Sequence, residues 1–321
     1  MTAAINIRCL EWAGKLLGEK EVHFSTNLNN KISFKDSLIT KAKQFALRRK
    51  DIFVDFSNKE NYELIINQLN NYNPKLVQGF PSFMYSLATF AKNNNVYCKK
   101  FQIFESTGEQ LYSFQKDLIE EIFGCKVFNR YGDAEFGIIA FECNKHCGLH
   151  ICQDNVIVEN LTNINGENEL IVTTLSNKAM PLIRYRTGDL GTIIKENCDC
   201  GNNFAKIDNI KGRVHDFIKI SDGKYVSTSF FLDILDKYSF MDDFQLFDNE
   251  NQIYLLLKLK SYTPLNQLVK LQEEVFNILL LQDKQFNIVL VGKYNYSSAG
   301  KFRYIINDIS NFEQAIKEVK I

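Results

Sequence analysis

Short apolar runs alternate along much of the chain with segments whose apolar residues recur every three or four positions. The runs are typical of buried strands and the second pattern is typical of helices, so the sequence predicts a mixed α/β domain. The predicted strands cover residues 76–78, 101–107, 126–129 and 170–174, and the predicted helices cover residues 62–69, 82–91 and 110–123. The helix that starts at Ser82 follows a turn containing glycine and proline, and its start either borders a ligand or is an ordinary N-cap.

The pattern changes near residue 211, where a second and smaller domain is predicted. Strands are expected at residues 217–220, 244–247, 253–260 and 287–291, and helices at residues 230–238 and 264–281. This order of elements predicts a small α+β cap domain. Because 321 residues exceed what one hydrophobic core usually sustains, we expect two domains, residues 1–212 and residues 213–321.

Composition narrows the class of protein. Lys and Arg total 38, as do Asp and Glu, so the zero net charge gives no indication of binding to nucleic acid or to an anionic membrane. The longest apolar runs, such as residues 253–257, fall far short of the roughly 20 residues of a membrane helix. No secretory signal is recognised, and a cytoplasmic location is predicted. The eight cysteines are then expected to be thiols or metal ligands rather than disulfides.

Residues 180–191 (MPLIRYRTGDLG) place three charged side chains in an otherwise apolar, strand-like stretch. Arg184, Arg186 and Asp189 would be costly to bury without partners. Gly188 predicts a sharp turn at residues 187–189, because glycine tolerates positive φ and lets a ligand approach the backbone. A carboxylate held by such a turn is suited to accept two hydrogen bonds from the cis-diol of a ribose.

This segment resembles the Tyr-Arg-Thr-Gly-Asp motif of the adenylate-forming superfamily, in the branch of phenylacetate-CoA ligases and capsule-biosynthesis proteins. Four further motifs follow in that family's order: residues 106–109 (STGE), 131–135 (YGDAE), 212–216 (GRVHD) leading to Gly223, and 300–301 (GK). Five ordered motifs across nearly the whole chain make the resemblance specific. It implies an α/β large domain, incomplete at its N-terminus, followed by a small and mobile α+β cap domain.

The resemblance implies ATP-dependent activation of a carboxylic acid as an acyl-adenylate, with transfer to a thiol such as CoA. It assigns nucleotide binding to Ser106, Gly108, Glu109, Tyr131, Gly132, Asp189 and Arg213. Glu135 is then the ligand of the magnesium ion that bridges the phosphates. Lys301 is the adenylation lysine, which neutralises charge at the α-phosphate, and His215 is the hinge of the small domain. The sequence does not choose between aromatic acids and other acyl or amino acids as the substrate.

Three features depart from the family pattern. Ala134 stands where many relatives carry a hydroxyl residue, and His215 stands where they carry aspartate or lysine. The early loop, rich in Ser, Thr and Gly, that wraps the ATP phosphates is not found. We therefore expect that the chain lacks an N-terminal portion, that it makes little acyl-adenylate by itself, and that it still binds adenylate analogues. The alternatives are a nucleotide-binding protein without turnover, or one part of a split enzyme whose second chain supplies the loop.

Cysteine and histidine cluster in two places. The members are Cys143, His146, Cys147, His150 and Cys152 in the first cluster and Cys198 and Cys200 in the second. Two short clusters of this kind predict a tetrahedral zinc site, with free core cysteines as the alternative. By comparison with relatives, we expect Cys143, His150, Cys198 and Cys200 as ligands, with Cys147 or His146 as substitutes for Cys143. Four protein ligands leave no open position, so the zinc would be structural. A third hypothesis is that the chain is a purely structural zinc module, and it predicts that the chain does not bind AMP.

Overall fold

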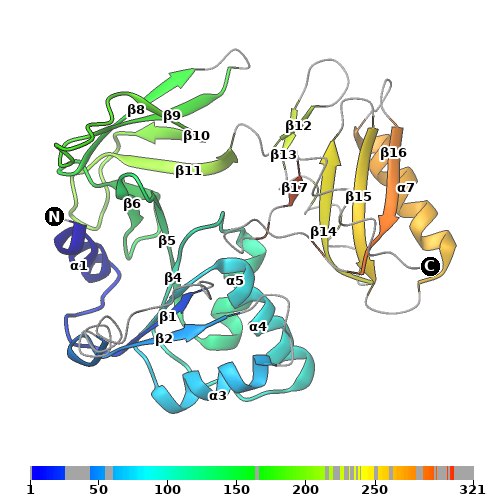
Figure 1. Cartoon of the computed structure of the whole chain (residues 1–321), viewed down its shortest axis with the longest axis horizontal. Coiled ribbons are helices and arrows are strands. Elements are labelled where there is room, and N and C mark those ends of the chain that lie inside the picture. Colours follow the sequence, from blue (N-terminus) through cyan, green and yellow to red (C-terminus); the bar gives the residue numbers. More distant parts are fainter. Residues whose placement is uncertain are drawn as a thin grey trace. The chain divides into compact units, whose positions relative to one another are not determined.

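The computed structural model describes residues 2–25, 44–54, 61–162, 166–213, 217–219, 225–227, 231, 235, 238, 240–248, 252–259, 263–279, 285–292, 294, 302 and 304–306. The chain divides into two compact units, Met1–Lys211 and Gly212–Ile321. The first is a large mixed α/β sheet domain and the second is a smaller sheet domain, which confirms the predicted fold class (Figure 1). Among these residues, no helix combines the length and apolarity needed to cross a bilayer.

One sheet of 11 strands organises the first unit (Figure 1). Its first five strands are parallel and follow the order β2 (Arg49–Phe53), β1 (Glu21–Ser25), β3 (Leu76–Gly79), β4 (Ile103–Ser106) and β5 (Lys126–Asp133). The order continues with β6 (Gly137–Glu142), β7 (Leu149–Ile151), β11 (Lys206–Arg213), β10 (Tyr185–Ile194), β9 (Asn168–Thr174) and β8 (Val156–Thr162). Pairing changes from parallel to antiparallel between β5 and β6, so the β5–β6 hairpin joins the two halves of the sheet.

Helices cover both faces of the parallel strands (Figure 1). They include α1 (Thr2–Trp12), α3 (Tyr62–Tyr72), α4 (Pro81–Asn94) and α5 (Ser113–Phe123). The last three pack on one face, against side chains such as Val77 and Phe104. α1 packs on the other face, against Leu76 and Ile103, which precede those two residues along the strands and therefore point the opposite way. Burial of both faces explains the continuous apolar runs of these strands.

The start of α4 differs from one of the two alternatives for this segment, in which Ser82 is the N-cap of the helix. Pro81 occupies the first helical position, and Phe80 precedes it as the N-cap residue. Proline suits this position because its φ is preset and it has no N–H group to leave unpaired. Ser82 lies in the first turn instead, and its hydroxyl donates to Glu109 Oε2 at 2.5 Å. The N-cap interpretation is therefore wrong, and Ser82 ties α4 to the loop that follows β4.

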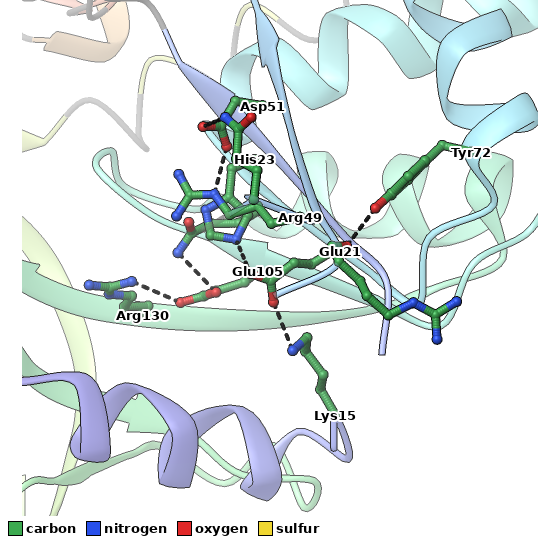
Figure 2. A network of polar contacts seen from close by, with 11 residues as sticks. Lys15, Glu21, His23, Arg49, Asp51, Tyr72, Glu105 and Arg130 are labelled. Carbon is green, nitrogen blue, oxygen red and sulfur yellow. Dashed lines mark hydrogen bonds and ion pairs between the residues drawn. The ribbon is translucent and has the colours of Figure 1, made fainter. Parts of the chain in front are cut away.

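A row of polar side chains crosses the α1 face of the parallel sheet (Figure 2). His23, Gln78 and Glu105 hold matching register positions on β1, β3 and β4. Glu105 is fully buried, and its carboxylate accepts hydrogen bonds from Arg130 Nη1 at 3.1 Å and from Gln78 Nε2 at 3.0 Å. A buried carboxylate needs such partners, because removing it from water is costly.

Glu21, at one end of this network, is expected to make stability depend on pH in the acid range. Its carboxylate lies 2.7 Å from Lys15 Nζ and 3.3 Å from His23 Nε2. Burial raises the pKa of Glu21, but hydrogen bonds from His23 and Lys15 outweigh burial and lower the pKa from 4.5 to about 2. Between these values the folded chain binds fewer protons than the unfolded chain, so stability falls as the pH drops through this window.

Urea unfolding followed from pH 4.5 towards pH 2 measures this dependence. Glu21→Gln should flatten the loss of stability, since the variant has no carboxylate to protonate. Glu11→Gln, which removes an exposed carboxylate of α1, should keep the wild-type slope. Equal slopes for wild type and Glu21→Gln would contradict this role of Glu21.

The second unit has a four-stranded sheet with a helix packed on it. The strand order is β16 (Gln285–Leu290), β15 (Gln252–Leu259), β14 (Met241–Asp248) and β17 (Ile305–Ile306). The helix, α7 (Leu265–Leu279), buries Leu271 and Val275 against the sheet side chains Leu255 and Phe286. A separate ribbon pairs β12 (Phe217–Lys219) with β13 (Tyr225–Ser227). The predicted helix at residues 264–281 and the predicted strands of this unit are present, with shifted bounds.

Candidate nucleotide site and metal centre

Two motifs that lie far apart along the chain meet in the first unit. Tyr131, on β5, donates its hydroxyl to Asp189 Oδ2, on β10, at 2.7 Å. Thr187 supports this contact, because its Oγ1 accepts the Asp189 N–H at 3.1 Å and donates to the Leu170 carbonyl at 2.9 Å. Asp189, whose carboxylate is predicted to bind ribose, is therefore held at its side chain by Tyr131 and at its backbone N–H by Thr187.

Acidic groups gather around this contact. Burial raises the pKa of Asp133, and the charges of Glu135 and Asp189 add to the rise. Burial, followed by the charge of Asp189, also raises the pKa of Tyr131, so the phenol is protonated and donates at neutral pH. This excess of negative charge suits a ligand that arrives with a cation. Asp133 and Thr187 are further candidate site residues, because both lie near Asp189, and their only signal in the sequence is that each lies inside a motif.

The β5–β6 hairpin next to Tyr131 contains Gly132 and Glu135. A Cβ at Gly132 would lie 2.1 Å from the Gly137 carbonyl oxygen, so only glycine allows the two strands to approach this closely. Glu135 is exposed in the turn that follows. Magnesium commonly uses one or two protein carboxylates together with substrate phosphates, and an exposed single carboxylate fits that role.

Gly132→Ala should lower the free energy of unfolding by about 2–3 kcal/mol, because the backbone of the hairpin must move to admit the methyl group. The matched control is Ala134→Ser, which adds one atom at an exposed position of the same hairpin and should change stability by less than about 0.5 kcal/mol. Urea unfolding compares the two variants with wild type. A Gly132→Ala chain as stable as Ala134→Ser would show that the hairpin relaxes at little cost.

Arg184 and Arg186, at the start of β10, are exposed rather than buried, and each pairs with a carboxylate. Arg184 pairs with Glu159, and Arg186 pairs with Glu169, which is buried. The sharp turn predicted at residues 187–189 is wrong. Residues 187–189 lie inside β10, where the pairing with β9 shifts register between Arg186 and Leu190, and Gly188 has φ +76°. A bulge of this kind leaves Asp189 on the strand and still uses the glycine.

The predicted nucleotide loop at residues 106–109 follows β4. Ser106 is fully buried at the end of the strand, and Gly108 has φ +83°. The carboxylate of Glu109 accepts hydrogen bonds from the hydroxyl of Ser82 at 2.5 Å and from its N–H at 3.3 Å. Glu109 thus binds the first turn of α4, where negative charge is favourable at a helix N-terminus.

The predicted zinc ligands come together in the first unit. The metal-binding atoms of Cys143, His150, Cys198 and Cys200 all lie within 4.8 Å of one another. His150 Nδ1 lies 3.1 Å from the Phe204 carbonyl oxygen, and its Nε2 lies 3.3 Å from Cys200 Sγ. A carbonyl at Nδ1 favours the tautomer that presents Nε2 to a metal. Three sulfurs and one imidazole nitrogen are a usual donor set for structural zinc, so these residues fit that metal.

The other members of the two clusters have different neighbours. Cys152 Sγ lies 3.7 Å from Cys9 Sγ of α1, and His146 Nδ1 lies 3.0 Å from Glu142. Burial raises the pKa of Cys198, but hydrogen bonds from Cys147 and from the Cys200 backbone and side chain lower it to about 6. The thiolate, which is the form that binds metal, is therefore favoured at neutral pH.

Four residues of the predicted motifs are placed only in part or not at all by the structure. Lys301 and His215 lie outside the described residues, as does Gly223. The backbone of Arg213 ends β11, and its side chain is not described.

Sequence comparison finds that the chain is similar to a phenylacetate-coenzyme A ligase and to protein CapK. No family model matches the chain. The chain is 28% identical over 166 residues to a phenylacetate-coenzyme A ligase of Thermus thermophilus, covering 47% of this chain and 37% of that protein. It is 27% identical over 257 residues to protein CapK of Staphylococcus aureus, covering 78% of this chain and 56% of CapK. The chain thus spans 37% and 56% of the length of these two relatives.

The fold of this chain is also similar to the folds of solved ligase structures. The structure of 2-hydroxyisobutyryl-CoA ligase in the postadenylation state, in complex with R3-HIB-AMP, matches 99% of this chain and 72% of its own, with a TM-score of 0.72 and 18% identity. The anthranilate CoA ligase AuaEII in complex with anthranoyl-AMP matches 96% and 62%, with a TM-score of 0.61 and 11% identity. The fold is therefore that of the adenylate-forming ligases. Sequence similarity to phenylacetate-CoA ligases and CapK confirms the branch that the five motifs predicted.

Proposed function

We propose that this chain binds ATP and activates a carboxylic acid as an acyl-adenylate, which passes to a thiol such as CoA. The observation that carries the proposal is the hydrogen bond from Tyr131 to Asp189, which unites two nucleotide-binding motifs at one place. Relatives named phenylacetate-coenzyme A ligase and structural neighbours solved with acyl-AMP support the same chemistry.

The reaction consists of two displacements. An oxygen of the acid first forms a bond to the α-phosphorus and pyrophosphate leaves; the thiol sulfur then attacks the acyl carbon and AMP leaves. In this proposal Asp189 accepts the ribose hydroxyls, Tyr131 stacks on the adenine and Glu135 holds the magnesium. Lys301 neutralises the charge that develops at the α-phosphate. Further contacts to the nucleotide come from Ser106, Gly108, Glu109, Gly132 and Arg213, and His215 is the hinge of residues 213–321.

The quartet Cys143, His150, Cys198 and Cys200 is proposed to hold one structural zinc ion. Its donor set and its closed, four-ligand arrangement support that role. A cytoplasmic location and a part in capsular polysaccharide biosynthesis belong to the same proposal, the latter because CapK is among the relatives.

A second candidate function is nucleotide binding without turnover. Ala134 favours it, because this exposed methyl side chain cannot supply the hydroxyl that many relatives direct at a phosphate. Both candidates require the site built on Tyr131 and Asp189.

Pyrophosphate exchange by the purified chain, tested with a panel of aromatic, aliphatic and amino acids, separates the candidates. Calorimetry with a non-hydrolysable acyl-adenylate analogue runs beside it. Acid-dependent exchange that is lost in Lys301→Ala but kept in Lys99→Ala, a control at an exposed lysine, supports the ligase. Analogue binding without exchange supports the second candidate. A chain that neither exchanges pyrophosphate nor binds the analogue would refute both.

A further inference from the structure

A fifth sulfur lies against the proposed zinc quartet. Cys147 is exposed, whereas Cys143 and Cys198 are buried and Cys200 is partly buried. Cys147 Sγ lies 2.8 Å from Cys198 Sγ, while the Sγ atoms of Cys143 and Cys198 are 3.7 Å apart. The quartet already supplies the four ligands of a closed zinc site. Cys147 is therefore a thiol beside a metal ligand that is open to solvent and not needed for coordination.

The backbone holds Cys147 in this place. His146 has φ +51°, and its N–H donates to the Cys143 carbonyl at 3.0 Å, which closes a tight turn before Cys147. Gly148 follows with φ +102°, and a Cβ there would lie 2.9 Å from the Ile207 carbonyl oxygen. Because the residues on both sides are constrained, the backbone of Cys147 stays next to the quartet.

We propose that Cys147 is a peroxide-sensitive thiol that forms a disulfide with Cys198 and thereby releases the zinc. Cys147 first loses its proton, and its sulfur then attacks one oxygen of hydrogen peroxide. The S–O bond forms as the O–O bond breaks, and the departing hydroxide takes up a proton, which gives a sulfenic acid and one water molecule. The Cys198 thiolate then attacks the sulfenic sulfur, the S–S bond forms, and the hydroxyl leaves as a second water molecule with one proton from solvent. The two sulfurs together lose two electrons and the peroxide gains them. A Cys198 engaged in a disulfide no longer ligates zinc, so three ligands remain.

The other close pair of cysteines provides an internal comparison. Cys9 and Cys152 have Sγ atoms 3.7 Å apart, but both residues are 0% exposed. Peroxide attack requires access as well as proximity. Cys147 is the one exposed cysteine among the eight in the chain, so it should react first.

Zinc release from the zinc-loaded chain tests the proposal, measured with a chromogenic chelator after addition of hydrogen peroxide. Cys147→Ser should retain one zinc per chain and release it at least about tenfold more slowly than wild type, because the exposed thiol is gone. Cys98→Ser, a partly buried cysteine away from the quartet, should release zinc at the wild-type rate. Peptide mapping of the oxidised wild type should find the link between Cys147 and Cys198 first.

Equal release from wild type and Cys147→Ser would overturn the proposal, as would a first disulfide between Cys9 and Cys152. Loss of zinc from untreated, folded Cys147→Ser would also overturn it, because Cys147 would then be a ligand. Peptide mapping needs only the wild type, so it decides the matter even where the variant fails to fold. The inference rests on the proposed zinc site: a wild type without zinc refutes both, whereas zinc-loaded wild type with unaltered release in Cys147→Ser refutes this inference alone.

Discussion

Replacing Cys198 with serine should give a chain that carries no zinc and melts at a lower temperature than wild type. Cys198 contributes one of four ligand atoms that lie within 4.8 Å of one another, and a hydroxyl is a poor replacement for a thiolate. The quartet joins the turn after β6, β7 itself and the segment between β10 and β11, so its loss frees segments that lie far apart in sequence. Each kcal/mol lost should lower the melting temperature of a unit of this size by about 2–4 °C.

Elemental analysis should find one zinc per wild-type chain and none in Cys198→Ser, with thermal unfolding measured on both. Cys98→Ser is the control, because Cys98 is a partly buried cysteine outside the quartet and should keep both zinc and the wild-type melting temperature. A strong chelator should lower the melting temperature of wild type to that of Cys198→Ser. A wild-type chain that is free of metal and fully stable would remove the zinc site from this account.

A Cys/His metal site and several sheet strands could be predicted because their signals are local. Thiols and imidazoles in two short clusters indicate metal binding, whereas the choice of Cys143, His150, Cys198 and Cys200 among them came from the resemblance to the family. The strand at Ile103–Ser106 lies within a predicted run of apolar residues, since both faces of the sheet are covered and few polar residues interrupt it.

Other features depend on partners distant in sequence and could not be predicted. The pairing of Glu109 with Ser82 fixes the loop after β4 onto α4, yet neither residue signals the other. α1 was not expected, because the burial of Ile5 and Cys9 depends on the sheet face that the helix covers. Its ion pair between Arg8 and Asp154 spans 146 positions along the chain.

Asp189→Ala should weaken the binding of AMP by about 1.5–3 kcal/mol, the range for hydrogen bonds to a charged group. That loss corresponds to a dissociation constant about 10- to 150-fold higher. Asp189 is already held by the Tyr131 hydroxyl at 2.7 Å and by the Thr187 side chain at its N–H, so the carboxylate is ordered before the nucleotide arrives. Calorimetry of AMP binding to wild type and variant measures the difference. Unchanged affinity would take Asp189 out of the site.

The same measurement with 2′,3′-dideoxy-AMP identifies which part of the nucleotide Asp189 contacts. If its carboxylate binds the ribose hydroxyls, Asp189→Ala should cost little affinity for the dideoxy nucleotide, because those hydroxyls are absent from it. Asp117→Ala, which removes an exposed carboxylate of α5, should bind both nucleotides as wild type does. If Asp189→Ala loses the same affinity for AMP and for dideoxy-AMP, the carboxylate acts through the charge or the fold of the site and not through the ribose hydroxyls. If affinity is lost for AMP alone, the carboxylate binds the ribose hydroxyls.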